Sequence, residues 1–165
     1  MADYTSVELD DPRIEQRRAV TFAGIRRRHQ KEGFDFAEFP RQMNELKSML
    51  PGLAGRVGDL VCDIFWSMLD DADNFDYLVG VVVQDDVALP EGFARLSLPA
   101  QSYAIVTCPP GEDPRDTVYT LWHEWFPNAR AVPLGADAPE FIYEHAESYR
   151  EAERNEPVEI FVPVR

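Results

Sequence analysis

QSYAIVTC (residues 101–108) and DPRDTVYTLWHEWFP (113–127) are the stretches that decide the fold of this 165-residue chain. QSYAIVTC is rich in β-branched and aromatic residues, which is typical of a strand. DPRDTVYTLWHEWFP predicts an amphipathic helix, because Asp113 can cap its N-terminus and Pro114 suits its first turn. Pro127 is expected to end that helix.

Elements of the same kinds are predicted on both sides of this pair. The segment from Phe39 to Leu50 carries apolar residues at helical spacing, and Pro51-Gly52 ends it. Alternating or continuous apolar runs predict further strands at 19–25, 60–68, 75–83, 139–145 and 157–164. The chain therefore shows the order β-α-β-β twice.

This duplication predicts an α+β fold. Two pseudo-symmetric β-α-β-β units, at about 16–84 and 100–165, are expected to form an antiparallel sheet with two helices and a central ligand groove. Together they make one domain over 16–165, preceded by a polar leader at 1–15. We expect the strand at 75–83 to lie at a sheet edge, where it could pair two subunits in a homodimer.

Composition excludes several classes of function. The net charge of −14 disfavours direct binding of nucleic acid, which needs clustered Lys and Arg. The sequence lacks an apolar run of the roughly 20 residues that span a bilayer, and its N-terminus lacks the features of a signal peptide. Cys62 and Cys108 lack metal-type spacing and are expected to be buried thiols. We therefore expect a cytoplasmic protein with no membrane association, no metal and no cofactor.

Five segments in order resemble the GyrI-like, AraC-type effector-binding domain. They are DYLVGVVV (76–83), LPEGFARLSLPAQSYAIVTCPPG (89–111), TVYTLWHEWFP (117–127), APEFIYEH (138–145) and VEIFVPV (158–164). The resemblance implies two β-α-β-β units with a ligand groove between the two helices. Only about 15 residues precede the first predicted strand, too few for a helix-turn-helix, so we expect a stand-alone module.

The resemblance also implies where an acid should lie. The family's site centres on a glutamate in a Phe-Glu-x-Tyr motif, in which Phe141 matches the Phe and Ile142 occupies the Glu position. Glu144 stands where the Tyr would be. Because strand residues alternate between faces, Glu140 and Glu144 share the face of Ile142, so a carboxylate could still enter the groove.

Aromatic faces and carboxylates together attract organic cations. The candidate walls of the groove are Phe65 or Trp66, Tyr103, Tyr119, Trp122 and Phe161, with Glu140 and Glu144 as the acids. Phe65 and Trp66 are adjacent on a strand and face opposite ways, so at most one lines the groove, and Trp66 is favoured. A packing role in the core is the alternative for Trp122 and Tyr103, and a surface position is the alternative for both glutamates.

The leading functional prediction is a protein that binds small molecules, such as effectors, drugs or toxins, and favours apolar or cationic aromatic ligands. Two alternatives come from the family. One is a hydrolase of reactive, cyclopropane-type electrophiles, in which Glu144 and Tyr103 would be catalytic. The other is an acidic protein that inhibits a DNA-binding enzyme such as gyrase, with a protein as its partner.

Overall fold

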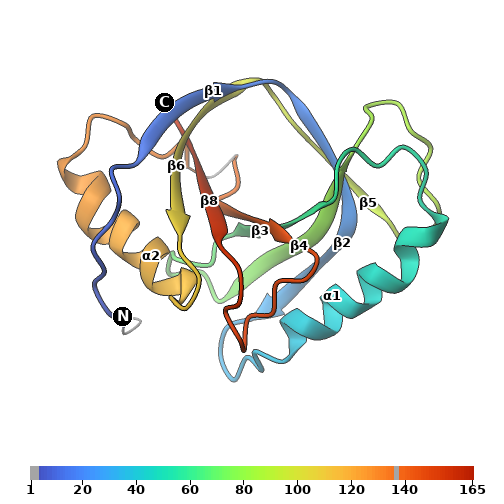
Figure 1. Cartoon of the computed structure of the whole chain (residues 1–165), viewed down its shortest axis with the longest axis horizontal. Helices are drawn as coiled ribbons and strands as arrows, with labels where there is room; N and C mark the ends of the chain where they lie inside the picture. The colour runs from blue at the N-terminus through green and yellow to red at the C-terminus, as the bar shows by residue number, and fades with distance from the viewer. Residues whose placement is uncertain (1–3, 136–137) are drawn as a thin grey trace.

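The computed structural model describes residues 4–135 and 138–165, so residues 1–3 of the predicted leader lie outside the described part. Within it, two helices lie on one side of an eight-stranded antiparallel sheet (Figure 1). The strands are β1 (Arg13–Arg17), β2 (Val20–Gln30), β3 (Leu60–Trp66), β4 (Asn74–Val83), β5 (Ala94–Leu98), β6 (Gln101–Cys108), β7 (Phe141–Ala146) and β8 (Val158–Val164). The helices are α1 (Glu38–Met49) and α2 (Pro114–Thr120).

The strand order confirms the predicted duplication. The sheet runs β1-β6-β8-β7-β3-β4-β2-β5, so β7 and β3 meet at its centre. Outward from that centre, β3-β4-β2 on one side corresponds to β7-β8-β6 on the other. Each half follows the order strand, helix, strand, strand, and each carries one additional edge strand. The α+β class expected from the sequence is therefore correct.

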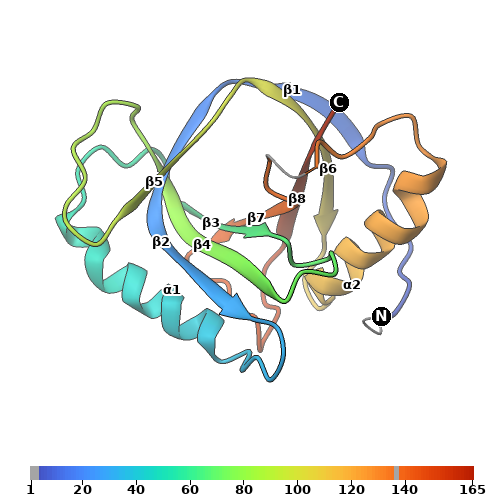
Figure 2. The same ribbon diagram turned by 180° about the vertical axis from the view of Figure 1, so that it is seen from behind.

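The sheet is strongly curled. β1 and β2, and likewise β5 and β6, arch over one side of the central strands, while both helices lie on the other side (Figures 1 and 2). α1 packs beneath β2 and β4, and α2 packs beside β8. The segment that precedes β1 in the sequence runs alongside α2 and the turn after it. There the Tyr4 hydroxyl donates a hydrogen bond to Glu124 at 2.7 Å, and the Val7 N–H donates one to Thr120 at 3.1 Å.

Two strands lie where none was predicted, and one predicted position is wrong. β1 is short, polar and almost wholly exposed, so it lacks the apolar alternation that marks a strand in a sequence. β5 does alternate apolar and polar residues, as ARLSL, and this short signal was missed. β4 was expected at an edge but lies between β3 and β2. Its apolar residues are buried on both faces, which suits an interior strand rather than a pairing surface for a second subunit.

α2 begins as predicted but changes its form before the predicted end. The Asp113 side chain accepts a hydrogen bond from the Arg115 N–H at 3.0 Å and caps the helix. The α-helix ends at Thr120 and continues as a wider π turn over Leu121–Trp125 and a 3-10 turn over Phe126–Asn128. None of the helices among the described residues is both long and apolar enough to cross a membrane.

Candidate ligand-binding site

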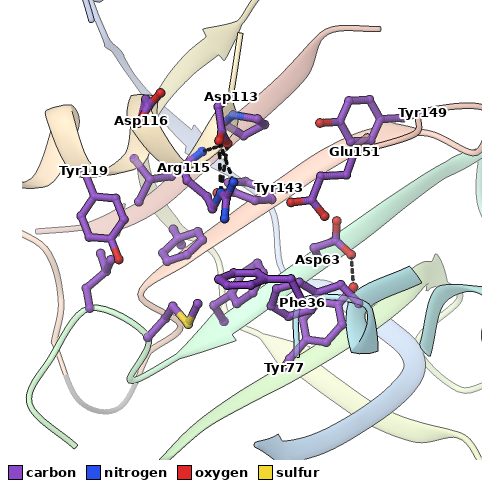
Figure 3. A pocket seen from close by; sticks show the side chains of 17 residues that line it. Phe36, Asp63, Tyr77, Asp113, Arg115, Asp116, Tyr119, Tyr143, Tyr149 and Glu151 are labelled. Atoms are coloured by element: carbon purple, nitrogen blue, oxygen red, sulfur yellow. Dashed lines mark hydrogen bonds and ion pairs between the residues drawn. The ribbon is translucent and has the colours of Figure 1, made fainter. Parts of the chain in front are cut away.

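A groove opens between α1 and α2, with the sheet as its floor. It has a volume of about 300 Å³, and we call it the interhelical groove (Figure 3). Eight aromatic side chains from both halves of the chain supply most of its wall, together with four acids and one arginine. The aromatics are Phe36, Phe39, Phe65, Tyr77, Tyr119, Phe141, Tyr143 and Tyr149, the acids are Asp63, Asp113, Asp116 and Glu151, and the base is Arg115.

The aromatic rings of the floor stack around Phe65. Its ring centroid lies 4.6 Å from that of Phe141 and 5.0 Å from that of Tyr77, both in stacked geometry. Tyr143 meets Phe65 edge-on at 5.5 Å. These offset and edge contacts stabilise aromatic clusters beyond their buried area, so the floor is preformed. It joins β3, β4 and β7, and therefore spans the junction between the two halves.

Two of the acids are already compensated. The Asp113 carboxylate forms ion pairs with the guanidinium groups of Arg115, at 2.8 Å, and Arg154, at 3.1 Å. Burial raises the pKa of the Asp113 carboxyl, but the bonds to Arg115 lower it more, so the net pKa lies below the usual value. Asp63 accepts a hydrogen bond from the Tyr77 hydroxyl at 2.5 Å and lies 2.8 Å from His145 Nε2.

Glu151 differs from these two acids. It extends over the groove toward Asp63 (Figure 3), and within the described part of the chain no side chain hydrogen-bonds or ion-pairs with it. Desolvation raises the pKa of its carboxyl, as do the charges of Asp63 and Asp113, while Arg115 opposes them. The net pKa of Glu151 lies above the usual value, since burial outweighs the charges of Arg115 and Arg154. Glu151 therefore supplies a carboxyl group beside the aromatic floor that has no hydrogen-bond or ion-pair partner among the described residues.

Comparison with known families identifies the chain. The model of the family Cass2, integron-associated effector binding protein, matches residues 13–164. The chain belongs to this family. The match covers both β-α-β-β units and the edge strands of this Cass2 family member. No curated protein sequence matches it.

Solved structures share the fold of this Cass2 family member at low sequence identity. SAV2435, solved bound to tetraphenylphosphonium, is 15% identical with a TM-score of 0.69, and the match covers 94% of each chain. The integron cassette protein VCH_CASS2 of Vibrio cholerae is 15% identical with a TM-score of 0.53, covering 95% of this chain and 97% of that one. The EcmrR C-terminal domain is 14% identical with a TM-score of 0.67, covering 93% and 96%.

The seven candidate residues from the sequence fall into three separate places. Tyr119, on α2, lines the interhelical groove. Trp66, Trp122 and Glu140 line a neighbouring hollow beside the π turn, which we call the side cavity. Tyr103, Glu144 and Phe161 line a third space on the face of the sheet opposite the helices, which we call the inner cavity.

Strand parity explains why the interhelical groove and the inner cavity receive different residues of the same strand. On β7, Ile142 and Glu144 point away from the helices, while Phe141 and Tyr143 point toward them. Glu144 therefore lies on the face of β7 that points away from the groove, and its carboxylate does not line the groove. The acid at the floor comes instead from β3, where Asp63 sits between Cys62 and Ile64.

Of the two adjacent candidates on β3, the structure places Phe65 in the groove and the favoured Trp66 in the side cavity. Asp63, Tyr143, Tyr149 and Glu151 also line the groove and were not singled out from the sequence. Asp63 and Phe65 on β3 alternate in phase with Phe141 and Tyr143 on β7, and the structure pairs Asp63 with Tyr143 and Phe65 with Phe141. A buried aspartate inside an apolar strand was the available signal, because an acid in such a place needs partners or a ligand. The contributions of Tyr149 and Glu151 depend on the course of the turn after β7, which has no periodic pattern.

Proposed function

We propose that this Cass2 family member binds lipophilic organic cations, and that the interhelical groove is the binding site. The observation that carries the proposal is the position of Glu151, an acid without a hydrogen-bond or ion-pair partner among the described residues, over a preformed aromatic floor. A desolvated cation above aromatic faces gains about 2 kcal/mol, and a nearby carboxylate adds a Coulombic preference for positive charge.

Two further facts support this class of ligand. The net charge of −14 raises the local concentration of cations around the molecule. The structurally similar protein SAV2435 was solved with tetraphenylphosphonium, which is a lipophilic cation. The volume of about 300 Å³ lies at the lower end of the range for small-molecule pockets, so one multi-ring ligand would fill the groove.

The test is calorimetric titration with two ions of matched shape and opposite charge, tetraphenylphosphonium and tetraphenylborate. We expect one phosphonium ion to bind per chain, and the borate to bind at least about ten-fold more weakly because of the acids around the groove. Equal affinity for the two ions, or absence of binding by the phosphonium, would overturn the proposal.

A variant locates the site. Glu151→Gln should weaken phosphonium binding about two- to five-fold, since a solvent-accessible charge pair contributes up to about 1 kcal/mol. Glu153→Gln removes the same charge from an exposed position of the same turn that does not line the groove, and should leave binding unchanged. An equal effect of both variants would indicate general electrostatics rather than a site at Glu151.

A further inference from the structure

The inner cavity carries a second inference. We propose that it is a separate small-molecule site, and that it takes an organic anion with an apolar body, such as an aromatic carboxylate or sulfonate. The cavity has a volume of about 520 Å³, well within the range of ligand pockets. This site is independent of the proposed function of the interhelical groove and prefers the opposite charge.

The sheet separates the two sites completely. On β3, Cys62 lines the inner cavity and the next residue, Asp63, lines the groove. On β7, Ile142 lines the inner cavity, while Phe141 and Tyr143 line the groove. The two sets of lining residues have no member in common, so ligands could occupy both faces at once.

The curl of the sheet creates the cavity. β1 and β2 arch above the central strands (Figures 1 and 2), and residues from the arch and from the central strands face the same space. A curled sheet of this size encloses room for about one small ligand, as small barrels do. The deeper lining is apolar, and its members belong to a second hydrophobic cluster on this face of the sheet: Phe22, Cys62, Val82, Ile142 and Phe161.

The charges of the inner cavity run against those of the whole molecule. Arg17 and Arg18 line it against a single acid, Glu144, although acidic residues far outnumber basic ones in the chain. The Arg17 side chain is 47% exposed; its guanidinium pairs with Glu15 at 2.9 Å and lies 5.4 Å from the centre of the Phe161 ring. A guanidinium beside an aromatic ring suits a planar carboxylate or sulfonate attached to an apolar group.

Tyr103 adds a directed donor. Its hydroxyl oxygen accepts a hydrogen bond from Gln101 Nε2 at 2.9 Å, which leaves the hydroxyl proton available to an acceptor on a ligand. Tyr103 is buried and its ring meets Phe161 edge-on, so the position of the hydroxyl is set by packing. The donors of the cavity therefore outnumber its one carboxylate.

Glu144 sets the limit on affinity for an anion. Burial raises the pKa of its carboxyl, the charge of Glu159 on β8 raises it further, and Arg17 on β1 and the neighbouring His145 lower it. The ionised carboxylate repels a bound anion, and its protonation removes that repulsion. Binding of the anion should therefore strengthen as the pH falls through the pKa of Glu144.

The test uses 1-anilinonaphthalene-8-sulfonate, a fluorescent apolar sulfonate, with the full chain. We expect saturable binding of one molecule per chain at pH 7, weakened about five-fold or more in Arg17→Gln/Arg18→Gln by the loss of charge-assisted contacts. Glu144→Gln should strengthen binding. The control Arg27→Gln/Arg28→Gln removes the same charge from positions that do not line the cavity, and should leave binding unchanged.

Two further measurements separate this site from the groove. Val82→Phe fills the cavity from β4 and should reduce the fluorescence change, with a thermal melt to verify that the variant is folded. Saturating tetraphenylphosphonium should not displace the sulfonate, because the two sites lie on opposite faces of the sheet. The proposal is overturned if the paired arginine variant and folded Val82→Phe both bind the sulfonate normally, or if the phosphonium competes with it. The results with the variants do not bear on binding of the cation in the groove, which Glu151→Gln tests separately.

Discussion

His145 Nε2 lies 2.8 Å from Asp63 Oδ2, and the pair is buried beneath the aromatic floor. The other ring nitrogen, Nδ1, lies 2.9 Å from the Ala146 carbonyl oxygen, which can only accept a hydrogen bond. Nδ1 must therefore carry a proton. Although burial lowers the pKa of His145, Asp63 raises it more, which favours the doubly protonated ring, and Nε2–H then donates to Oδ2. The pair is formally neutral, so the deepest acid of the groove is compensated within the protein.

This pair makes stability depend on pH. Burial lowers the pKa of His145, but the charge of Asp63 and the hydrogen bond to it raise it more, and the net pKa is above the usual value. The stabilisation is complete below the unfolded-state pKa of about 6.5 and is lost as the pH rises through the folded-state pKa. We expect the free energy of unfolding, measured with urea from pH 6 to 9, to fall more steeply than in Asp63→Asn/His145→Gln. Parallel curves for the two proteins would contradict this.

A bound cation should release a proton from the same pair. Positive charge in the groove favours loss of the shared proton, so the cation lowers the pKa of His145, and affinity in turn rises as the pH rises towards the folded-state pKa of His145. Titrating tetraphenylphosphonium in phosphate and in Tris at one pH reveals the proton as a difference in observed enthalpy. Glu151→Gln should retain this difference in enthalpy, and Asp63→Asn/His145→Gln should lose it. Equal enthalpies in the two buffers for the wild-type protein would show that the pair releases no proton.

Phe36 tests the aromatic contribution at the mouth of the groove. The Phe36 side chain is 49% exposed, and the centre of its ring lies 5.0 Å from the guanidinium carbon of Arg115. Phe36→Ala should weaken phosphonium binding about two- to five-fold, as expected for an exposed cation–π contact of up to about 1 kcal/mol. Val132→Ala, which is equally exposed but outside the groove, is the matched control in the calorimeter. Unchanged affinity in Phe36→Ala would remove Phe36 from the site.

Glu140 should act on stability rather than on binding. Its carboxylate accepts the backbone N–H groups of Leu69, at 3.0 Å, and of Met68, and so holds the turn after β3. Glu140→Ala should lower the free energy of unfolding by about 1–3 kcal/mol because it leaves these donors without their partner. Glu140→Gln retains an accepting oxygen and should cost less. Both variants should bind tetraphenylphosphonium like wild type, and a loss of affinity at wild-type stability would place Glu140 in the site.

Gly24 and Gly80 lie opposite each other in the pairing of β2 and β4. A Cβ atom on Gly24 would lie 2.1 Å from the Val79 carbonyl oxygen, so the backbone would have to move. Gly24→Ala should therefore destabilise the fold by about 3 kcal/mol, at the upper end of overpacking costs. Gly52→Ala meets no atom within 4 Å and should change stability by less than about 0.5 kcal/mol in the same urea melt. Similar stabilities for the two variants would contradict this reading of the strand contact.

Local patterns were sufficient for most elements of the fold. The predicted strand at 101–108 has the bounds of β6, and the Asp113 cap starts α2 where expected, because both depend on neighbouring residues. β1 and β5 could not be predicted in the same way. β1 is polar and almost wholly exposed, so only its pairing with distant β6 defines it as a strand. β5 has an alternating pattern, ARLSL, but over only five residues, and its pairing with distant β2 defines it.

The sequence by itself determined the duplicated β-α-β-β order, the acidic charge and the supply of aromatic rings, since each of these follows from residue types and their spacing. Only the tertiary structure decided which face of each strand the helices cover. A shift of one residue along β3 or β7 exchanges the groove for the inner cavity, because strand side chains alternate between faces. For this reason Asp63, rather than Glu144, lies at the floor of the groove, while Glu144 faces a separate cavity lined by two arginines.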